Sequence, residues 1–426
     1  MKVLLANSPF GGGGITTFAT ELVACLSEDT ELTVVLGDDK KAPITNPRVK
    51  VIYHDTMSLT VNNALYFIDL INNVVKPDVV LVSAALIIPI IVPYINDNIK
   101  ILTVGHSGRF LFTDYSVFNH QYLDRIIAAS SSYNKKYLER RFKIKDINKI
   151  KVIYNFVARD EKFENLRLNK PEQSPISIVY AGASSVHKSP ELVAQIATEL
   201  LKTDLDFRFF WTGNPTIPLT TNILKHTKFK DVRQMMPQDP RLIFPGRIPS
   251  KEEYDLLLGS ANIFLAPSKN EGCSMATLEA HRTGCILLVA DYENSNREIV
   301  EAGKSGFVVE HNDVGGFVNV ISDIVKNPTS YAAYYENSHE TFIRLLSYPV
   351  WRKNIFDAIN SELSHRPRKT RISRLSIQVD ILRMKLLKFS GTMEQLFEFT
   401  IPSYLSFRKQ YKLYKKNNKE EQKPTV

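Results

Sequence analysis

Short runs of Val, Ile and Leu alternate with helical patterns along most of the chain. The first series of runs reads KVLLA, ELTVVLG, KVIYH, DVVLVS, KILTVG, RIIAAS and KVIYNF. After the polar segment RDEKFENLRLNKPEQSP, a second series reads ISIVYAG, DFRFFWTG, RLIFPG, NIFLAP, CILLVA and GFVVE. Strands that are buried on both faces and separated by helices are typical of parallel sheets. We therefore predict an α/β protein of two doubly wound, Rossmann-like domains.

The restart of the strand series sets the expected domain boundaries. We expect the first domain over residues 1–165 and the second over 166–345, followed by a closing helix at 346–365 and a basic amphipathic tail at 366–426. When two doubly wound domains follow each other, the loops at the carboxyl ends of their strands are expected to line a ligand-binding cleft.

Length and composition agree with an ordinary globular protein. The chain has 426 residues, of which 44% are hydrophobic and 23% are charged, enough for two or three domains with their own cores. Its three cysteines are too scattered for a disulfide framework or a metal site, and MKVLLANSPF lacks the pattern of a signal peptide. We expect a cytoplasmic protein, with peripheral attachment to the cytoplasmic membrane face as an alternative.

One uncharged stretch, residues 79–96, reaches the length of a candidate membrane span. Pro89 and Pro93 would interrupt such a helix, and VVLVS continues the strand series. We expect a buried strand followed by a short buried helix.

The positive charge of the chain is confined to its tail. Residues 366–426 contain 15 Lys and Arg against 5 Asp and Glu, a net charge of +10, which leaves 39 basic and 40 acidic residues, or −1, for the rest. A nucleic-acid groove would need a basic stripe in the body of the protein, so no nucleic-acid partner is expected. In the tail, Leu375, Val379, Leu382 and Leu386 recur at helical spacing among basic residues. This pattern predicts a helix that lies on an anionic membrane surface or packs against protein, and both alternatives stay open.

The segment NEGCSMATLEAHRTG places Glu271 and Glu279 around a small-residue turn. Ser274 is a candidate N-cap for a helix that begins near Met275. The free amides and the dipole of a helix N-terminus favour an anion such as phosphate, and helical side chains lean back toward that end, which would bring Glu279 near the same ligand. The alternative is that both glutamates are solvated charges near a helix start.

Three further segments follow predicted strands. The glycine loop NSPFGGGGITTF, with Gly12, Gly13 and Gly14, permits close approach of backbone to a ligand, but it matches neither GxGxxG nor a P-loop, which argues against NAD and ATP. Lys188 in YAGASSVHKSP precedes a predicted helix, where its ammonium can neutralise a diphosphate. His106 follows the run KILTVG. The alternatives are that the glycine loop is only a flexible turn, that Lys188 is an ordinary surface lysine, and that His106 is a hydrogen-bonded loop histidine.

The segment APSKNEGCSMATLEAHRTGC, with REIVEAGKSGFVV after it, resembles the donor domain of retaining glycosyltransferases of the GT-B fold, in particular glycosyltransferase family 4 and its glycogen-synthase-like relatives. The resemblance covers most of residues 1–345. It implies that Glu271 meets the donor sugar, that Glu279 meets the ribose of the nucleotide, and that Glu271, His106 and Lys188 serve catalysis.

The resemblance also implies a set of donor-binding positions, which comprises Gly12, Gly13, Gly14, Lys188, Arg247, Ile248, Glu271, Gly272, Ser274, Met275, Ala276 and Glu279. Two departures leave the identity of the donor sugar open. Ala183 stands where the family usually has an arginine, and DYENSNREIV replaces a loop that often has a pair of glycines. The family generally works without a metal, so neither a metal nor another cofactor is expected.

The sequence therefore predicts a retaining glycosyltransferase that moves a sugar from a nucleotide-diphosphate sugar to a glycan or lipid-linked acceptor, in surface polysaccharide or glycoconjugate synthesis. The resemblance implies a front-face mechanism, in which the leaving phosphate takes the acceptor proton. Two alternatives stay open: a nucleotide-sugar epimerase or hydrolase on the same fold, and a binding or assembly protein that has lost turnover.

Overall fold

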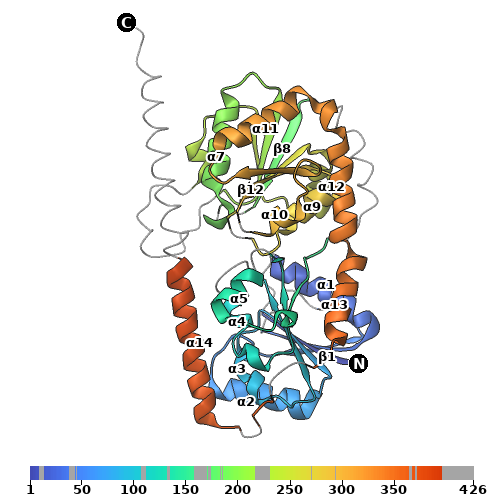
Figure 1. Cartoon of the computed structure of the whole chain (residues 1–426), viewed down its shortest axis with the longest axis vertical. Helices are drawn as coiled ribbons and strands as arrows, with labels where there is room; N and C mark the ends of the chain where they lie inside the picture. Colours follow the sequence, from blue (N-terminus) through green and yellow to red (C-terminus); the bar gives the residue numbers. More distant parts are fainter. Residues whose placement is uncertain are drawn as a thin grey trace. The chain divides into compact units, whose positions relative to one another are not determined.

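The computed structural model describes residues 1–8, 14–37, 44, 46–106, 112–131, 135–157, 170, 174–182, 184, 186–215, 231–269, 271–292, 294–363, 367–369 and 372–395. The chain divides into two compact units, shown in Figure 1. The first unit combines Met1–Asn155 with Pro349–Glu394, and the second is built on the described residues between Phe156 and Tyr348. Gly12, Gly13 and Ala183 lie outside the described residues.

The first unit is built on a seven-stranded parallel sheet in the order β3-β2-β1-β4-β5-β6-β7. Its strands are β1 (Lys2–Asn7), β2 (Glu31–Leu36), β3 (Val49–Tyr53), β4 (Val79–Ser83), β5 (Lys100–Gly105), β6 (Arg125–Ala128) and β7 (Ile150–Val152). Its helices are α1 (Gly14–Asp29), α2 (Val61–Asp69), η1 (Leu70–Val75), α3 (Ile87–Ile91), η2 (Val92–Tyr94), α4 (Phe112–Ser116), η3 (His120–Tyr122), α5 (Lys136–Phe142) and η5 (Ile147–Lys149), with α13 (Tyr348–Asn360) and α14 (Arg374–Gln395) from the far end of the chain.

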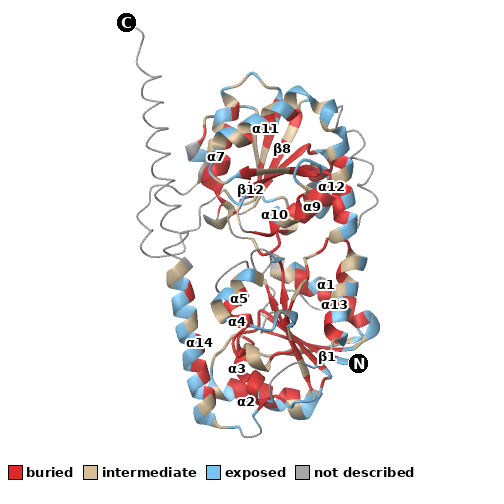
Figure 2. Cartoon of the chain, viewed as in Figure 1, coloured by how far each residue is buried: buried red, intermediate tan, exposed pale blue. Residues whose placement is uncertain are grey.

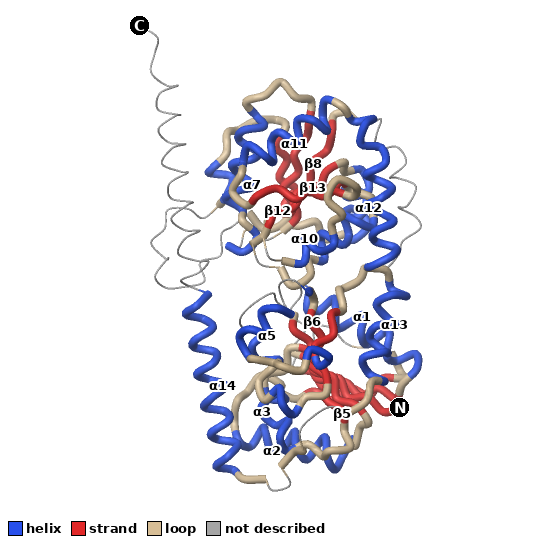
Figure 3. The backbone as a smooth tube through the Cα atoms, in the orientation of Figure 1, coloured by secondary structure: helices blue, strands red, loops and turns tan. Residues whose placement is uncertain are grey.

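The second unit is built on a six-stranded parallel sheet in the order β10-β9-β8-β11-β12-β13. Its strands are β8 (Ile176–Ala181), β9 (Phe207–Thr212), β10 (Leu242–Gly246), β11 (Ile263–Ala266), β12 (Ile286–Asp291) and β13 (Gly306–Glu310). Its helices are η7 (Val186–Lys188), α7 (Pro190–Leu201), η9 (Val232–Met235), α8 (Lys251–Ser260), α9 (Met275–Arg282), α10 (Ser295–Ile299), α11 (Val314–Lys326), η10 (Pro328–Tyr331) and α12 (Ala332–Leu345). In Figure 3, helices flank the red strands of each unit.

Every run that the sequence predicted as a strand forms one, so the two doubly wound Rossmann-like domains are confirmed. For the inner strands the reason is burial on both faces, visible as red strands in Figure 2, whereas the edge strands β3 and β10 are partly exposed. In β12, Leu288 packs into the core that contains Leu192 of α7 and Phe317 of α11, whereas Leu287 packs into the core that contains Leu258 of α8. The stretch 79–96 forms β4, α3 and η2, a buried strand and short buried helices as expected.

Helix α13 packs on the first unit, although the sequence suggested that it closes the second domain. Trp351 packs edge-on against Phe18 of α1, with ring centroids 5.9 Å apart. Lys100 Nζ donates to the Ile359 carbonyl at 2.6 Å. These contacts join residues more than 250 positions apart, which local patterns in the sequence do not reveal.

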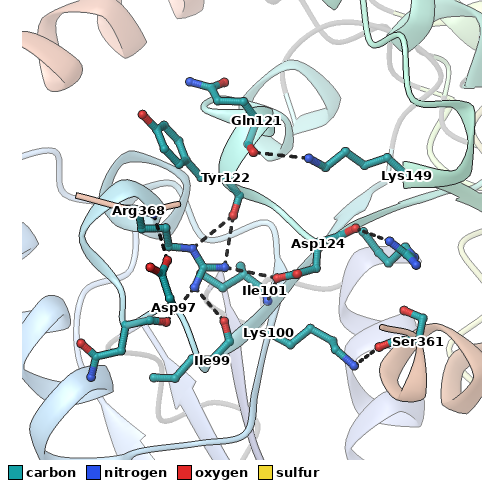
Figure 4. A network of polar contacts seen from close by, with 12 residues as sticks. Asp97, Ile99, Lys100, Ile101, Gln121, Tyr122, Asp124, Lys149, Ser361 and Arg368 are labelled. Carbon is teal, nitrogen blue, oxygen red and sulfur yellow. Dashed lines mark hydrogen bonds and ion pairs between the residues drawn. The ribbon is translucent and has the colours of Figure 1, made fainter. Parts of the chain in front are cut away.

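A buried arginine holds the segment after α13 to the same sheet (Figure 4). Arg368 pairs with Asp124 at 3.2 Å, and the two side chains are 1% and 0% exposed. Its guanidinium also donates to the Ile99 carbonyl at 2.7 Å. Burial lowers the pKa of Arg368, and the charge of Asp124 opposes that shift. Because the ion pair is desolvated, removal of Arg368 would leave the buried Asp124 without this counter-ion.

Helix α14 covers the first half of the predicted tail, and residues 396–426 lie outside the described residues. Within the part of the chain that the structure describes, no helix is long and apolar enough to cross a membrane.

Candidate functional site

The strand order of the second sheet reverses beside its first strand. The chain begins at β8, adds β9 and β10 on one side, and then returns to place β11, β12 and β13 on the other. Loops at the carboxyl ends of the strands diverge at such a point, and doubly wound proteins bind ligands in the crevice that results. Lys188 lies after β8 and Glu271 lies after β11. The topology therefore brings two of the predicted site residues to one edge of the sheet.

Lys188 and Glu271 form an ion pair at this reversal point. Their side chains are 22% and 11% exposed, so the pair is shielded from bulk water but remains accessible. Gly182 directly follows β8 and lies beside this pair. A methyl group at this position would be in ordinary contact with Lys188 Cδ at 3.7 Å but would approach the Tyr180 hydroxyl closely, at 3.2 Å. A larger side chain at position 182 would therefore press on Tyr180.

Two buried titratable groups lie beside this ion pair. Burial raises the pKa of Tyr180, and the charges of Glu271 and Glu191 raise it further. Burial lowers the pKa of His187, an effect that Glu271 opposes and Lys188 reinforces. Both rings are therefore neutral near pH 7. The charged groups at this edge are the Lys188–Glu271 pair and a second pair, in which Lys269 Nζ lies 3.6 Å from Glu191 Oε1.

Helix α9 begins where the sequence predicted. Ser274 is the N-cap residue, with φ −74° and ψ 114°, but its side chain makes no capping hydrogen bond. Gly272 and Ser274 are buried, whereas Met275 and Ala276 are half-buried. Because the serine hydroxyl does not cap the helix, the amides of the first turn are left for another acceptor, and the helix dipole favours an anion there.

Glu279 lies one turn into α9, in a polar cluster with the start of α8. Tyr254 hydrogen-bonds to its carboxyl group, and Lys251 Nζ lies 3.8 Å from its Oε1. Burial raises the pKa of Glu279, the charges of Lys251 and Arg282 oppose this shift, and Asp255 adds to it. The carboxylate is therefore partly desolvated, which makes it a good acceptor for hydroxyl groups of a ligand.

The loop between β12 and α10 is tied to the loop that carries Glu271. Asn294 Nδ2 donates to the Ser268 carbonyl at 2.7 Å, and the Ser295 amide donates to the Glu271 carbonyl at 3.3 Å. Asn296 is fully buried, and neither polar atom of its side chain has a hydrogen-bond partner among the described residues. A buried amide without partners costs free energy, which makes Asn296 a candidate for contact with a ligand.

Arg247 and Ile248 follow β10, the edge strand two positions from β8. Arg247 is exposed and Ile248 is half-buried. The next residues start α8, where the Ser250 hydroxyl accepts a hydrogen bond from the Glu253 amide at 3.2 Å. Contact of these residues with a nucleotide base stays a prediction.

The first sheet has its own reversal point, between β1 and β4. Gly14 begins α1 after β1, and His106 follows β5. The Ser83 hydroxyl, at the end of β4, forms a hydrogen bond with His106 Nε2 at 2.8 Å, and Phe18 of α1 packs edge-on against the imidazole. Burial lowers the pKa of His106 to about 4. The imidazole is therefore neutral near pH 7 and can take part in hydrogen bonds without carrying charge.

Several residues at these edges were not predicted. Lys251 and Tyr254 stand one helical turn apart in the segment PSKEEY, a spacing that could have indicated a shared partner. Tyr180 gave no signal, because an aromatic residue in a buried strand is typical of a core. Asn296 could have been noticed only as part of the unusual loop DYENSN.

Comparisons with known proteins agree with this architecture. Residues 160–341 match the family model described as "Glycosyl transferases group 1". A segment of 65 residues is 35% identical to UDP-Gal:alpha-D-GlcNAc-diphosphoundecaprenol alpha-1,3-galactosyltransferase of Escherichia coli, and it spans 15% of this chain and 16% of that enzyme.

Solved structures resemble a much larger part of the chain. The crystal structure of Anabaena Alr3699/HepE in complex with UDP has a TM-score of 0.66 at 13% identity, over 85% of this chain and 100% of that chain. The apo form of the lipopolysaccharide outer core galactosyltransferase WaaB has a TM-score of 0.63 at 16% identity, over 84% and 99% of the two chains. The fold is therefore GT-B, and the second unit carries the sequence pattern of glycosyltransferase group 1.

Proposed function

We propose that this protein transfers a sugar from a uridine-diphosphate sugar to a lipid-linked or glycan acceptor, with retention of the anomeric configuration and without a metal cofactor. The observation that carries the proposal is the Lys188–Glu271 ion pair at the β8/β11 reversal point, beside the uncapped start of α9. A cation and free helix amides at one edge suit a diphosphate. The choice of uridine follows from the names of the compared proteins, which include UDP and UDP-Gal.

Each residue of this edge has a role in the proposed complex. Lys188 and the amides of Ser274 to Ala276 neutralise the diphosphate, and Glu271 accepts hydrogen bonds from hydroxyl groups of the sugar. Glu279 accepts hydrogen bonds from the ribose, for which its partly desolvated carboxylate is suited. Arg247 and Ile248 meet the base through their backbone.

The proposed transfer step breaks the bond between the anomeric carbon and the diphosphate oxygen. The acceptor hydroxyl forms the new bond on the same face of the sugar, and its proton passes to the departing phosphate. Lys188 stabilises the charge that develops on this phosphate. His106, neutral because burial lowers its pKa to about 4, serves as a hydrogen-bonding group for the donor or acceptor sugar and not as a cation.

A lipid-linked acceptor is favoured by two observations. The Escherichia coli enzyme named above acts on an acceptor that carries a diphosphoundecaprenol group, and the tail of this chain is basic, with a net charge of +10 over residues 366–426. Such an acceptor places the reaction in the synthesis of surface polysaccharide or glycoconjugates.

The test is a product assay with purified full-length protein. The protein is incubated with UDP-galactose, UDP-glucose or UDP-N-acetylglucosamine and a panel of saccharide-diphospholipids. The products are separated, and their masses are measured by mass spectrometry. We expect one donor to yield an acceptor extended by one sugar, with an α-linkage by NMR. Free sugar without an extended acceptor would indicate a hydrolase, an isomerised donor would indicate an epimerase, and an inverted linkage would contradict retention.

A further inference from the structure

Helix α14 has two apolar faces, and the first unit uses one of them. Ile377, Ile381 and Met384 pack in the core of that unit and are each at most 2% exposed. The other face carries an apolar stripe between 49% and 74% exposed, which consists of Leu375, Val379, Leu382, Leu386 and Phe389. The four aliphatic residues of the stripe are those whose spacing first indicated the helix. The protein therefore packs on α14 through a different face and leaves this stripe open.

Contacts at both ends of α14 fix it on the first unit. Near its start, the Tyr94 hydroxyl donates to Ser376 Oγ at 2.7 Å. Near its end, Arg141 Nη1 lies 2.9 Å from Glu394 Oε2. Because both ends are held, the exposed stripe is a fixed surface of the unit.

The charges of α14 are arranged around this stripe. At 100° per residue, the exposed Lys385 lies on one side of the stripe. The exposed Arg383 lies on the other side and pairs with Asp380 at 2.8 Å. The second acidic residue of the helix, Glu394, pairs with Arg141. The open face of α14 is therefore apolar along its middle, with the Lys385 ammonium along one edge and the Arg383–Asp380 ion pair along the other.

We propose that this face docks the protein on the anionic surface of a lipid bilayer, with α14 parallel to the membrane. An exposed apolar stripe on a helix in a basic region is typical of helices that lie at the boundary between headgroups and acyl chains. Residues 366–426 carry a net charge of +10, so charge complementarity favours anionic headgroups over a second copy of this positively charged region. The sequence after Gln395 adds 7 basic and 3 acidic residues to the same end of the chain. This inference is independent of the donor site.

Vesicle co-sedimentation of the full-length protein tests the proposal. Vesicles of phosphatidylcholine alone are compared with vesicles that contain phosphatidylglycerol. We expect binding to the anionic vesicles that weakens at high salt. Replacing Leu382 and Leu386 together by Ser should weaken binding about tenfold, and Lys385→Glu should weaken it as well. Val74→Ser is the matched control, because Val74 and Leu386 are both 61% exposed.

The stripe variants are expected to fold, since the replaced side chains are exposed, and an unchanged melting temperature checks this. Three results would overturn the proposal. The first is that the wild-type protein does not bind anionic vesicles. The second is that the Leu382 and Leu386 double variant binds as the wild type does, which would assign binding to another region. The third is that the wild type dimerises without lipid and the double variant does not.

Discussion

Replacing Glu271 by Gln is expected to separate nucleotide binding from sugar transfer. In the free protein the Glu271 carboxylate holds the Lys188 ammonium, so a diphosphate has to compete with that carboxylate for the cation. The amide of Gln keeps the shape and removes the charge, which releases the ammonium. We therefore expect Glu271→Gln to bind UDP more tightly than the wild type and to transfer sugar more slowly.

The exposure of the pair sets the expected size of this effect. Fully exposed ion pairs contribute up to about 1 kcal/mol, but these two side chains are 22% and 11% exposed, and hydrogen bonds to charged groups contribute about 1.5–3 kcal/mol. We expect a gain in UDP affinity of about 1–2 kcal/mol, or about 5- to 30-fold in Kd. Lys188→Met should have the opposite effect and weaken UDP binding, with a Kd about 10- to 100-fold higher.

Isothermal titration calorimetry with UDP on both single variants and the double variant measures the coupling. The gain from Glu271→Gln should vanish when Lys188 is Met, because the released ammonium is then absent. Lys202→Met is the matched control, since Lys202 is a 64% exposed lysine at the end of α7. A gain that persists in the double variant, or no gain at all, would refute the assignment of Lys188 to the diphosphate.

Three further predictions concern single side chains. The pKa of Glu279 is raised in the folded protein, so the stability that its protonated form contributes is present at low pH and is lost as the pH rises through the folded pKa. Glu279→Gln should therefore raise the melting temperature above pH 7 and weaken UDP binding. An unchanged pH profile of the melting temperature would contradict this. Arg368→Leu should lower the free energy of unfolding in urea by about 3–5 kcal/mol, because Asp124 would be left buried without its cation. Arg344→Leu is the control: this arginine is 55% exposed, and its loss should lower the free energy of unfolding by less than about 1 kcal/mol. Asn296→Ala should raise the KM for the donor without loss of melting temperature, since its amide has no described partner to lose; a lower melting temperature with unchanged KM would make it a structural residue.

The strands could be predicted from the sequence because each is specified locally. VVLVS, for example, becomes β4 with all five residues buried, and a run of that kind suits a strand covered on both faces. The partner of α13 could not be predicted in this way. Trp351 meets Phe18 across 333 positions of the chain, and nothing near Trp351 in the sequence encodes that contact.

Helix α14 shows the same limit on a smaller scale. Periodicity located the helix and its Leu375–Leu386 stripe, but the sequence offers two apolar faces. The choice between them depends on the surface of the first unit, where Ile377 and Ile381 fit the core.

At the candidate site, position along the chain was the informative signal. Lys188 and Glu271 each follow a predicted strand, and strand order brings their loops together. Apart from Arg282 of the same helix, the neighbours that shift the pKa of Glu279, Lys251 above all, come from α8, so their proximity depends on how α8 packs against α9.

The central claim is that the second unit binds a uridine diphosphate group at the β8/β11 edge. The most direct measurement is a thermal shift of the purified protein with UDP, GDP, ADP, CMP and their sugar conjugates, with Glu279→Ala as the paired variant. Ligand at about 100 times its Kd stabilises the folded state by about 2.7 kcal/mol. We predict that UDP and a UDP-sugar raise the melting temperature, that the other nucleotides do not, and that the shift shrinks in the variant. No shift with any nucleotide, or an equal shift in Glu279→Ala, would contradict the claim.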